Sequence, residues 1–267
     1  MPNSLKTIGT YAFNNDKNIT ELTLPNSVTS IGTYAFSNCI NLEQINIPVL
    51  LTTLSSYTFD GCSKLKKIGL PWGLNTIGSY AFQNCTALEE VNLFDNITEI
   101  GYQAFYQCSK LSAITLPAQL LTIGTSAFEK CELIEEIIIP DGVNSIGSKA
   151  FANCSALKRI VFGQSLLTLG SEIAVNCKAL EHIEIHPDNI AFKVENGILY
   201  TLDGARACLY ETNSSRTEIA LDENTKEIAA SVFKYSKLQK VILPESLITI
   251  GASAFAYSNL KDINFTN

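Results

Sequence analysis

Residues 28–48 read VTSIGTYAFSNCINLEQINIP, and the same pattern returns every 23 residues along most of the chain. The aliphatic residue of the Ile-Gly pair falls at Ile31, Leu54 and Ile77, and the phenylalanine at Phe36 and Phe59 keeps the same phase. A fixed period in this range is typical of a solenoid, in which one supersecondary unit is stacked on itself. The sequence therefore predicts a stack of about ten turns.

Each repeat contains two extended stretches and one corner. Residues 42–47 alternate apolar and polar side chains and end at Pro48, which indicates a half-buried strand. Residues 28–31 form a second, shorter extended stretch, after which Gly32 supplies a tight corner. We place Ala35 and Phe36 on one turn of helix or 3₁₀-helix. The expected fold is an α/β-type repeat solenoid with one long parallel sheet and short helical corners.

The consensus L-x-x-I-x-L-P followed by I-G-x-x-A-F-x-x-C, as in residues 111–117 and 123–131, resembles the BspA-like class of leucine-rich repeats. The resemblance covers essentially the whole chain. It implies a right-handed superhelix with a parallel β-sheet on its concave face. It also implies location on the cell surface or secretion, and adhesion to host or neighbouring-cell proteins.

The period breaks once, between Leu169 and Ile228. Asn196-Gly197 and Asp203-Gly204 separate three strand-like segments, and both dipeptides are typical of two-residue hairpin turns. We expect residues 187–227 to leave the stack as an inserted antiparallel β-meander within a single solenoid domain, residues 1–267. Similar segments interrupt other BspA-like repeats.

Seven of the eight cysteines also recur every 23 residues, namely Cys39, Cys62, Cys85, Cys108, Cys131, Cys154 and Cys177. An even number of cysteines is compatible with a set of disulfides. Equivalent positions of a stack have parallel Cα–Cβ bonds, however, whereas a disulfide needs them to converge. Asp16, Ser236 and Ser258 occupy the same position in other turns. We therefore interpret the cysteines as structural thiols that satisfy backbone groups of the loops, and not as metal ligands.

The candidate chemical motifs do not support an enzyme. The only histidines, His182 and His186, flank a predicted strand in which four residues span about 13 Å, too far for one zinc ion. No serine or cysteine beside them has the context of a nucleophile, and no G-x-G-x-x-G or P-loop is present. We expect no catalytic residue, no cofactor and no metal.

Charge and hydropathy limit the partners. A net charge of -7 with no basic stripe excludes a nucleic-acid partner. No apolar run is long enough to span a membrane, and the first residues do not resemble a signal peptide. The chain opens halfway through a repeat and neither end carries a polar cap, so we expect a fragment of a longer protein.

Outward positions of the predicted sheet give the candidate binding site. Ile138 and Val161 place two apolar side chains side by side, with Arg159, His182 and Glu184 adjacent. An apolar centre rimmed by charge is typical of an interaction surface. The alternative is that β-branched residues stand there only because they favour strands. We expect the inserted hairpins to wall one side of this surface.

Trp72, the only tryptophan, follows a proline at a position that is mostly polar or small in other turns. It is expected to be exposed, either as a binding anchor or as an incidental surface residue. The resemblance to BspA-like repeats implies a surface module that binds an extracellular-matrix or cell-surface protein. The alternative is a structural spacer or stalk, and the oligomeric state stays open.

Overall fold

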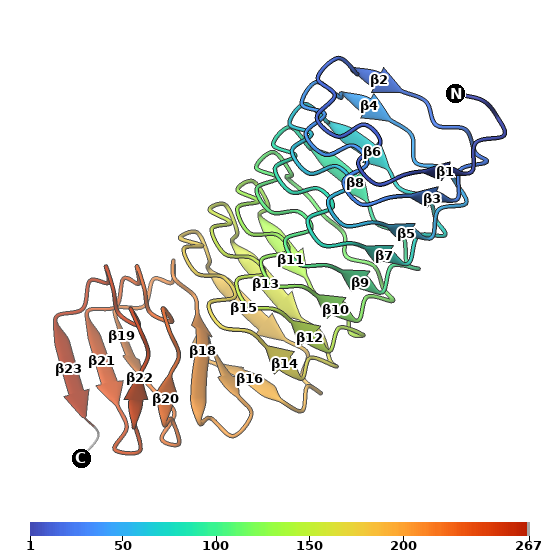
Figure 1. Cartoon of the computed structure of the whole chain (residues 1–267). Coiled ribbons are helices and arrows are strands. Elements are labelled where there is room, and N and C mark those ends of the chain that lie inside the picture. Colours follow the sequence, from blue (N-terminus) through green and yellow to red (C-terminus); the bar gives the residue numbers. More distant parts are fainter. Residues whose placement is uncertain (266–267) are drawn as a thin grey trace.

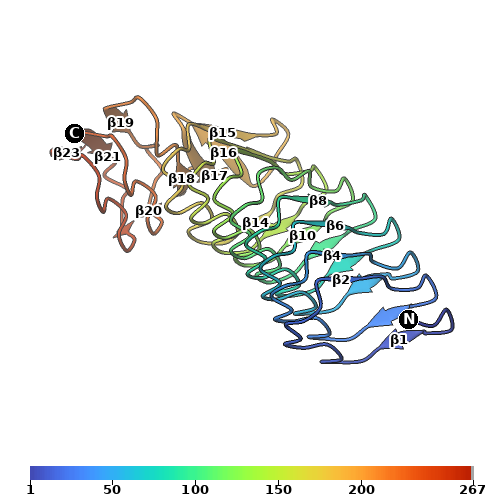
Figure 2. The ribbon, with the colours of Figure 1, turned by 90° about the horizontal axis from the view of Figure 1, so that it is seen from above.

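The computed structural model describes residues 1–265, which fold into an elongated stack of short strands and turns (Figure 1). The chain makes about eleven turns, one more than the sequence predicted. The first and the last described turns lie at opposite ends of the stack, as a second view also shows (Figure 2). The solenoid architecture predicted from the period is confirmed.

Most turns contribute two strands, so the stack carries two parallel rows. The shorter row comprises β1 (Thr7–Ile8), β3 (Ser30–Ile31), β5 (Thr53–Leu54), β7 (Thr76–Ile77), β9 (Glu99–Ile100), β10 (Thr122–Ile123), β12 (Ser145–Ile146), β14 (Thr168–Leu169), β20 (Glu227–Ile228) and β22 (Thr249–Ile250). The longer row comprises β2 (Glu21–Leu22), β4 (Gln44–Ile45), β6 (Lys67–Gly69), β8 (Glu90–Asn92), β11 (Glu136–Ile138), β13 (Arg159–Phe162), β15 (His182–Ile185), β19 (Glu218–Ala220), β21 (Lys240–Leu243) and β23 (Asp262–Phe265). We call the outward side of the longer row the long-strand face.

The prediction of one long parallel sheet is wrong in detail. Across residues 1–265 the longer row pairs only as β2–β4, β6–β8, β11–β13–β15 and β19–β21–β23. The shorter row pairs as β1–β3, as a six-stranded ladder from β5 to β14, and as β20–β22. Strands of two to four residues make few ladder hydrogen bonds, and residues 112–115, between β8 and β11, form no ladder pair among the described residues. Stacking therefore continues where the backbone pairing is interrupted.

The expected helical corners, and with them the α/β class, are also wrong: residues 1–265 contain no helix. The corner is a chain of tight turns in which Tyr34 and Asn38 adopt left-handed φ values of 59° and 58°. The N–H groups of Tyr34 and Phe36 donate to carbonyls of the next turn, those of Ser56 and Thr58. A left-handed residue every fourth position interrupts a right-handed helix, and the backbone groups are used between turns instead.

Gly32 at the corner is required by close approach of the previous turn. A Cβ atom there would lie 2.5 Å from the backbone nitrogen of Thr10. Any side chain would push the two turns apart, so the glycine of the repeat sets the spacing of the stack.

The phenylalanines form one buried column through the N-terminal turns. The rings of Phe82, Phe105 and Phe128 stack with centroids 5.2 Å apart at each step and interplanar angles of 14° and 4°. Each ring contacts equivalent rings above and below, which explains why the repeat keeps one large apolar residue in phase. A second column on the surface stacks Tyr34 on Tyr57 at 4.3 Å.

The cysteines of the repeat are free, and their thiols are hydrogen-bond donors. Cys108 donates to the carbonyl of Phe82, in the preceding turn, at 3.2 Å, and the six other cysteines of the column make the same contact one turn back. Burial raises the pKa of the Cys39 thiol to about 11. The interpretation of this column as structural thiols that satisfy loop carbonyls is confirmed.

The insertion forms the predicted antiparallel meander of β16 (Phe192–Glu195), β17 (Ile198–Thr201) and β18 (Arg206–Tyr210). It does not leave the stack completely, because β18 pairs in parallel with β20. Leu199 and Leu209 pack in the N-terminal core, whereas Tyr200 and Tyr210 pack in a second, C-terminal core. The meander is therefore a layer between two cores of one stack.

Candidate functional site

The predicted sheet residues lie together on β11, β13 and β15. Ile137, Ile160 and Ile183 point inward and are buried, so the residues on either side of them point outward. The parallel register places Ile138 beside Val161 and Val161 beside Glu184. It also places Arg159 beside His182. Five of the six candidate residues thus occupy three neighbouring strands of the long-strand face.

Arg159 is held by carboxylates on both sides. Its Nε and Nη2 atoms donate to the two carboxylate oxygens of Glu184 at 2.8 and 2.9 Å, and Nη1 donates to Glu136. The hydrogen bonds from Arg159 lower the pKa of the Glu184 carboxyl. The guanidinium is already engaged within the face, so the charged rim that the sequence predicted is an ion-pair network.

The apolar centre of this face is uneven. Ile138 is 53% exposed, whereas Val161, between its two neighbours, is only partly accessible. Ile138 stands on β11, the edge strand of this three-stranded sheet, and a partner that covers its exposed side chain gains free energy.

A hollow of about 680 Å³ lies at the edge of this face, between β15 and the residues that follow the meander. Its far wall is formed by residues 211–216. The Glu211 carboxylate accepts a hydrogen bond from the main-chain nitrogen of Ile183 at 3.2 Å and another from Arg216 at 3.0 Å. Asn213 donates to Glu181 at 2.7 Å. The wall is therefore the loop after β18, fastened to β15, and not the hairpins themselves.

Trp72 is exposed, as predicted, with 69% of its surface accessible. It stands in the loop after β6, and its carbonyl accepts a hydrogen bond from Asn96 at 2.7 Å. Its equivalent in the turn of Ile138 is Asp141, three turns along the stack, which corresponds to about 14 Å. The structure thus does not bring Trp72 to the other candidate residues.

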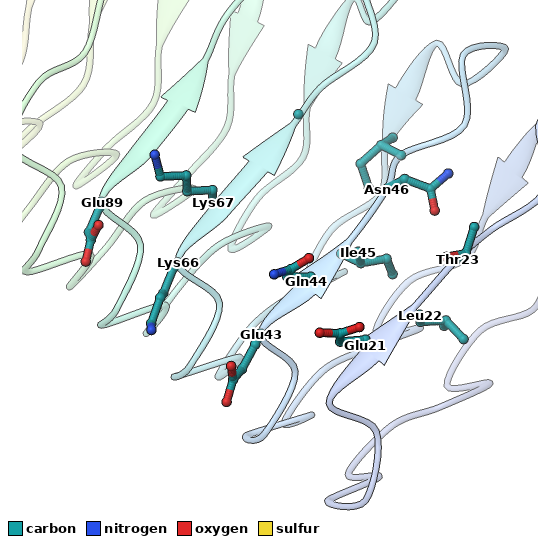
Figure 3. A pocket seen from close by; sticks show the side chains of 12 residues that line it. Glu21, Leu22, Thr23, Glu43, Gln44, Ile45, Asn46, Lys66, Lys67 and Glu89 are labelled. Atoms are coloured by element: carbon teal, nitrogen blue, oxygen red, sulfur yellow. The ribbon is translucent and has the colours of Figure 1, made fainter.

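The structure shows a second hollow that the sequence did not reveal. It lies on the long-strand face of the first turns, as two adjoining spaces of about 770 and 660 Å³ that share Lys67 and Glu89. Figure 3 shows the residues that line the first of these spaces. We call the whole hollow the N-terminal groove. Its floor consists of short side chains that follow the inward residue of each strand, namely Thr23, Asn46, Gly69, Asn92 and Thr115. The signal in the sequence was this run of small residues.

Two features bear on other kinds of site. Among residues 1–265, no group of three or more His, Cys, Asp or Glu side chains is placed to share a metal ion. The same residues include no helix with the length and hydropathy of a membrane span.

Comparisons with known proteins agree with the geometry. A family model described as "BspA type Leucine rich repeat region (6 copies)" matches residues 1–112, 75–196 and 205–267. No curated protein matches the chain.

Solved structures share the fold. A leucine-rich cell surface protein from Faecalibacterium prausnitzii is 26% identical, with a TM-score of 0.76 over 98% of this chain and 65% of the other. A leucine-rich repeat protein from Eubacterium ventriosum is 20% identical, with a TM-score of 0.64 over 80% of this chain and 68% of the other. The pneumococcal vaccine antigen PcpA is 24% identical, with a TM-score of 0.57 over 97% of this chain and 56% of the other. The chain thus spans just under two thirds of the Faecalibacterium protein.

Proposed function

Since this chain belongs to the BspA-type leucine-rich repeat family, we propose that it is a non-enzymatic binding module of a cell-surface adhesin-like protein. Its partner is an extracellular-matrix or cell-surface protein of a host or a neighbouring cell. The similar Faecalibacterium protein is a cell surface protein, which supports this location.

The observation that carries the proposal is an apolar pair on the sheet surface, the exposed Ile138 and the partly accessible Val161. The two side chains are in register on β11 and β13. Beside them the network of Glu136, Arg159 and Glu184 supplies polar groups fixed by hydrogen bonds. Protein interfaces combine an apolar centre with a polar rim, and rigid groups lose little freedom on binding.

The adjoining hollow gives this surface depth. His182 lies both on β15 and in the lining of the hollow, so a partner that covers Ile138 can extend across His182 toward Arg216. We place the binding site on β11–β15 and the loop 211–216.

The test is a binding screen against a panel of purified extracellular-matrix and cell-surface proteins. The variant Ile138→Asp with Val161→Asp places two charges at the apolar centre. The matched control is Leu167→Asp, since Leu167 is 55% exposed and stands just before β14, outside the long-strand face.

We expect the parent to bind a panel protein and the double variant to bind it at least about tenfold more weakly. The Leu167→Asp control should bind as tightly as the parent. Equal binding by the double variant would overturn the site. If the parent bound no panel protein, as a spacer would, the proposed function would be wrong.

A further inference from the structure

The N-terminal groove contains a strand residue that the fold does not require. Gly69 lies on β6 in register with Asn92 of β8. A Cβ atom on Gly69 would meet no other atom within 4 Å, and its φ is not in the left-handed region. Glycine weakens a strand unless it serves a tight bend or the close approach of another group. With no such neighbour inside the chain, Gly69 points to a ligand that approaches this backbone.

The other residues of the groove floor also leave the groove open. The side chain of Asn46 lies against the neighbouring turn, where it donates to the carbonyl of Leu24 at 2.8 Å and accepts from the nitrogen of Leu24 at 2.7 Å. It therefore does not rise into the groove. The open floor results from Gly69 and from side chains that are short or folded back.

The two edges of the groove differ in chemistry. One edge is acidic, because Glu21, Glu43, Glu89 and Glu90 outnumber Lys66 and Lys67 there. Figure 3 shows the side chains of Glu21, Glu43 and Glu89 on neighbouring strands, with Lys66 and Lys67 between them. Lys67 is itself paired with Glu90 at 3.1 Å. The potential along this edge is therefore negative.

The other edge is apolar. It is formed by the loops that follow the strands, in which Val49, Trp72 and Phe94 are exposed at or next to the same repeat position of successive turns. Phe94 also lines the groove. Exposed large apolar side chains gathered at one rim of a groove mark an interaction surface, and tryptophan is frequent among the residues that dominate binding energy.

We propose that the N-terminal groove binds an extended protein segment in which basic and apolar residues alternate. Successive side chains of an extended segment point to opposite sides. Such a segment, lying along the stack, directs its basic side chains to the acidic edge and its apolar side chains to Trp72 and Phe94. Its backbone passes over Gly69. The groove is separate from the β11–β15 surface, so a negative result at one site does not contradict the proposal for the other.

The length of the segment follows from the geometry. Five floor positions are separated by four strand spacings of about 4.8 Å, which gives about 19 Å, or about six extended residues. Synthetic peptides of about eight residues therefore cover the groove. The first peptide alternates lysine and leucine. The second has the same composition with all lysines before all leucines, and the third alternates glutamate and leucine.

Trp72 provides the readout, because it is the only tryptophan and stands at the apolar edge. We expect the alternating lysine peptide to shift the Trp72 emission to shorter wavelength and to bind at least about tenfold more tightly than either other peptide. The variant Gly69→Gln should fold normally and weaken this binding by about tenfold or more. The control Gly9→Gln, at a glycine with equal open space on the other row of strands, should bind like the parent.

A second variant tests the charge. Glu43→Lys with Glu89→Lys, both at exposed positions, should reverse the preference in favour of the glutamate peptide. Equal binding of the three peptides by the parent would overturn the proposal. Unchanged binding by folded Gly69→Gln, or an unchanged preference after charge reversal, would overturn it as well.

Discussion

Replacing Phe105 by alanine tests the column of stacked rings. Phe105 is 0% exposed and lies between Phe82 and Phe128, each at 5.2 Å. Removal of a fully buried phenylalanine costs about 3–5 kcal/mol of unfolding free energy, because the transfer term and the cavity term add. In a stack this loss falls on two interfaces, one with each neighbouring turn.

The comparison is Phe13→Ala in the first turn. Phe13 is half-buried, and its ring stacks on the ring of Phe36 with the centroids 5.2 Å apart. With part of its surface already in water and one interface affected, the expected cost is about 1–2 kcal/mol. The prediction is the ratio of the two losses of unfolding free energy, and not either loss alone.

Urea denaturation followed by circular dichroism measures both free energies. The Phe105 variant should show the lower midpoint, with its cost at least about twice that of the Phe13 variant. Equal costs, or a Phe105 cost below about 1 kcal/mol, would show that the turns do not depend on the ring column for their cohesion.

Two further predictions concern the thiols and the ion-pair network. Cys208 should be the first cysteine to react with a thiol reagent in the native protein, because it alone is partly accessible, and all eight should react in denaturant without reductant. If a folded Cys208→Ser variant still reacted as fast as the parent, the prediction would be wrong. Arg159 lowers the pKa of Glu184 in the folded state, so this ion pair stabilises the fold above the ordinary pKa of 4.5 and the gain is lost as the pH falls through the lowered pKa. The stability difference between the parent and Arg159→Gln should thus be present at neutral pH and shrink below pH 4.5, and a difference independent of pH would refute the assignment.

The period of the sequence predicted the buried column well, because a residue such as Phe105 packs against the equivalent phenylalanines of the turns before and after it. The helical corner was mispredicted for a physical reason. Whether a short segment closes its hydrogen bonds locally or onto the next turn depends on the stack, and Tyr34 donates to the next turn. Local propensity carries no information about that choice.

The sites were predictable in part. Register alone placed Ile138 beside Val161, and the structure agrees. The engagement of Arg159 by two carboxylates depends on side-chain geometry across three strands, which spacing does not specify. The importance of Gly69 was invisible for a related reason. A glycine at an outward position is informative only when the structure shows that a side chain would have fitted.

The layer formed by β16–β18 also separates two repeat lengths. Before it, Ile146 and Leu169 are 23 residues apart, and after it Ile228 and Ile250 are 22 apart. Each group packs against its own side of the layer, as Leu199 and Tyr200 show. The meander therefore joins two modules of different repeat length. Duplication or loss of repeats in one module leaves the packing of the other unchanged, so the two can vary in length and sequence separately during evolution.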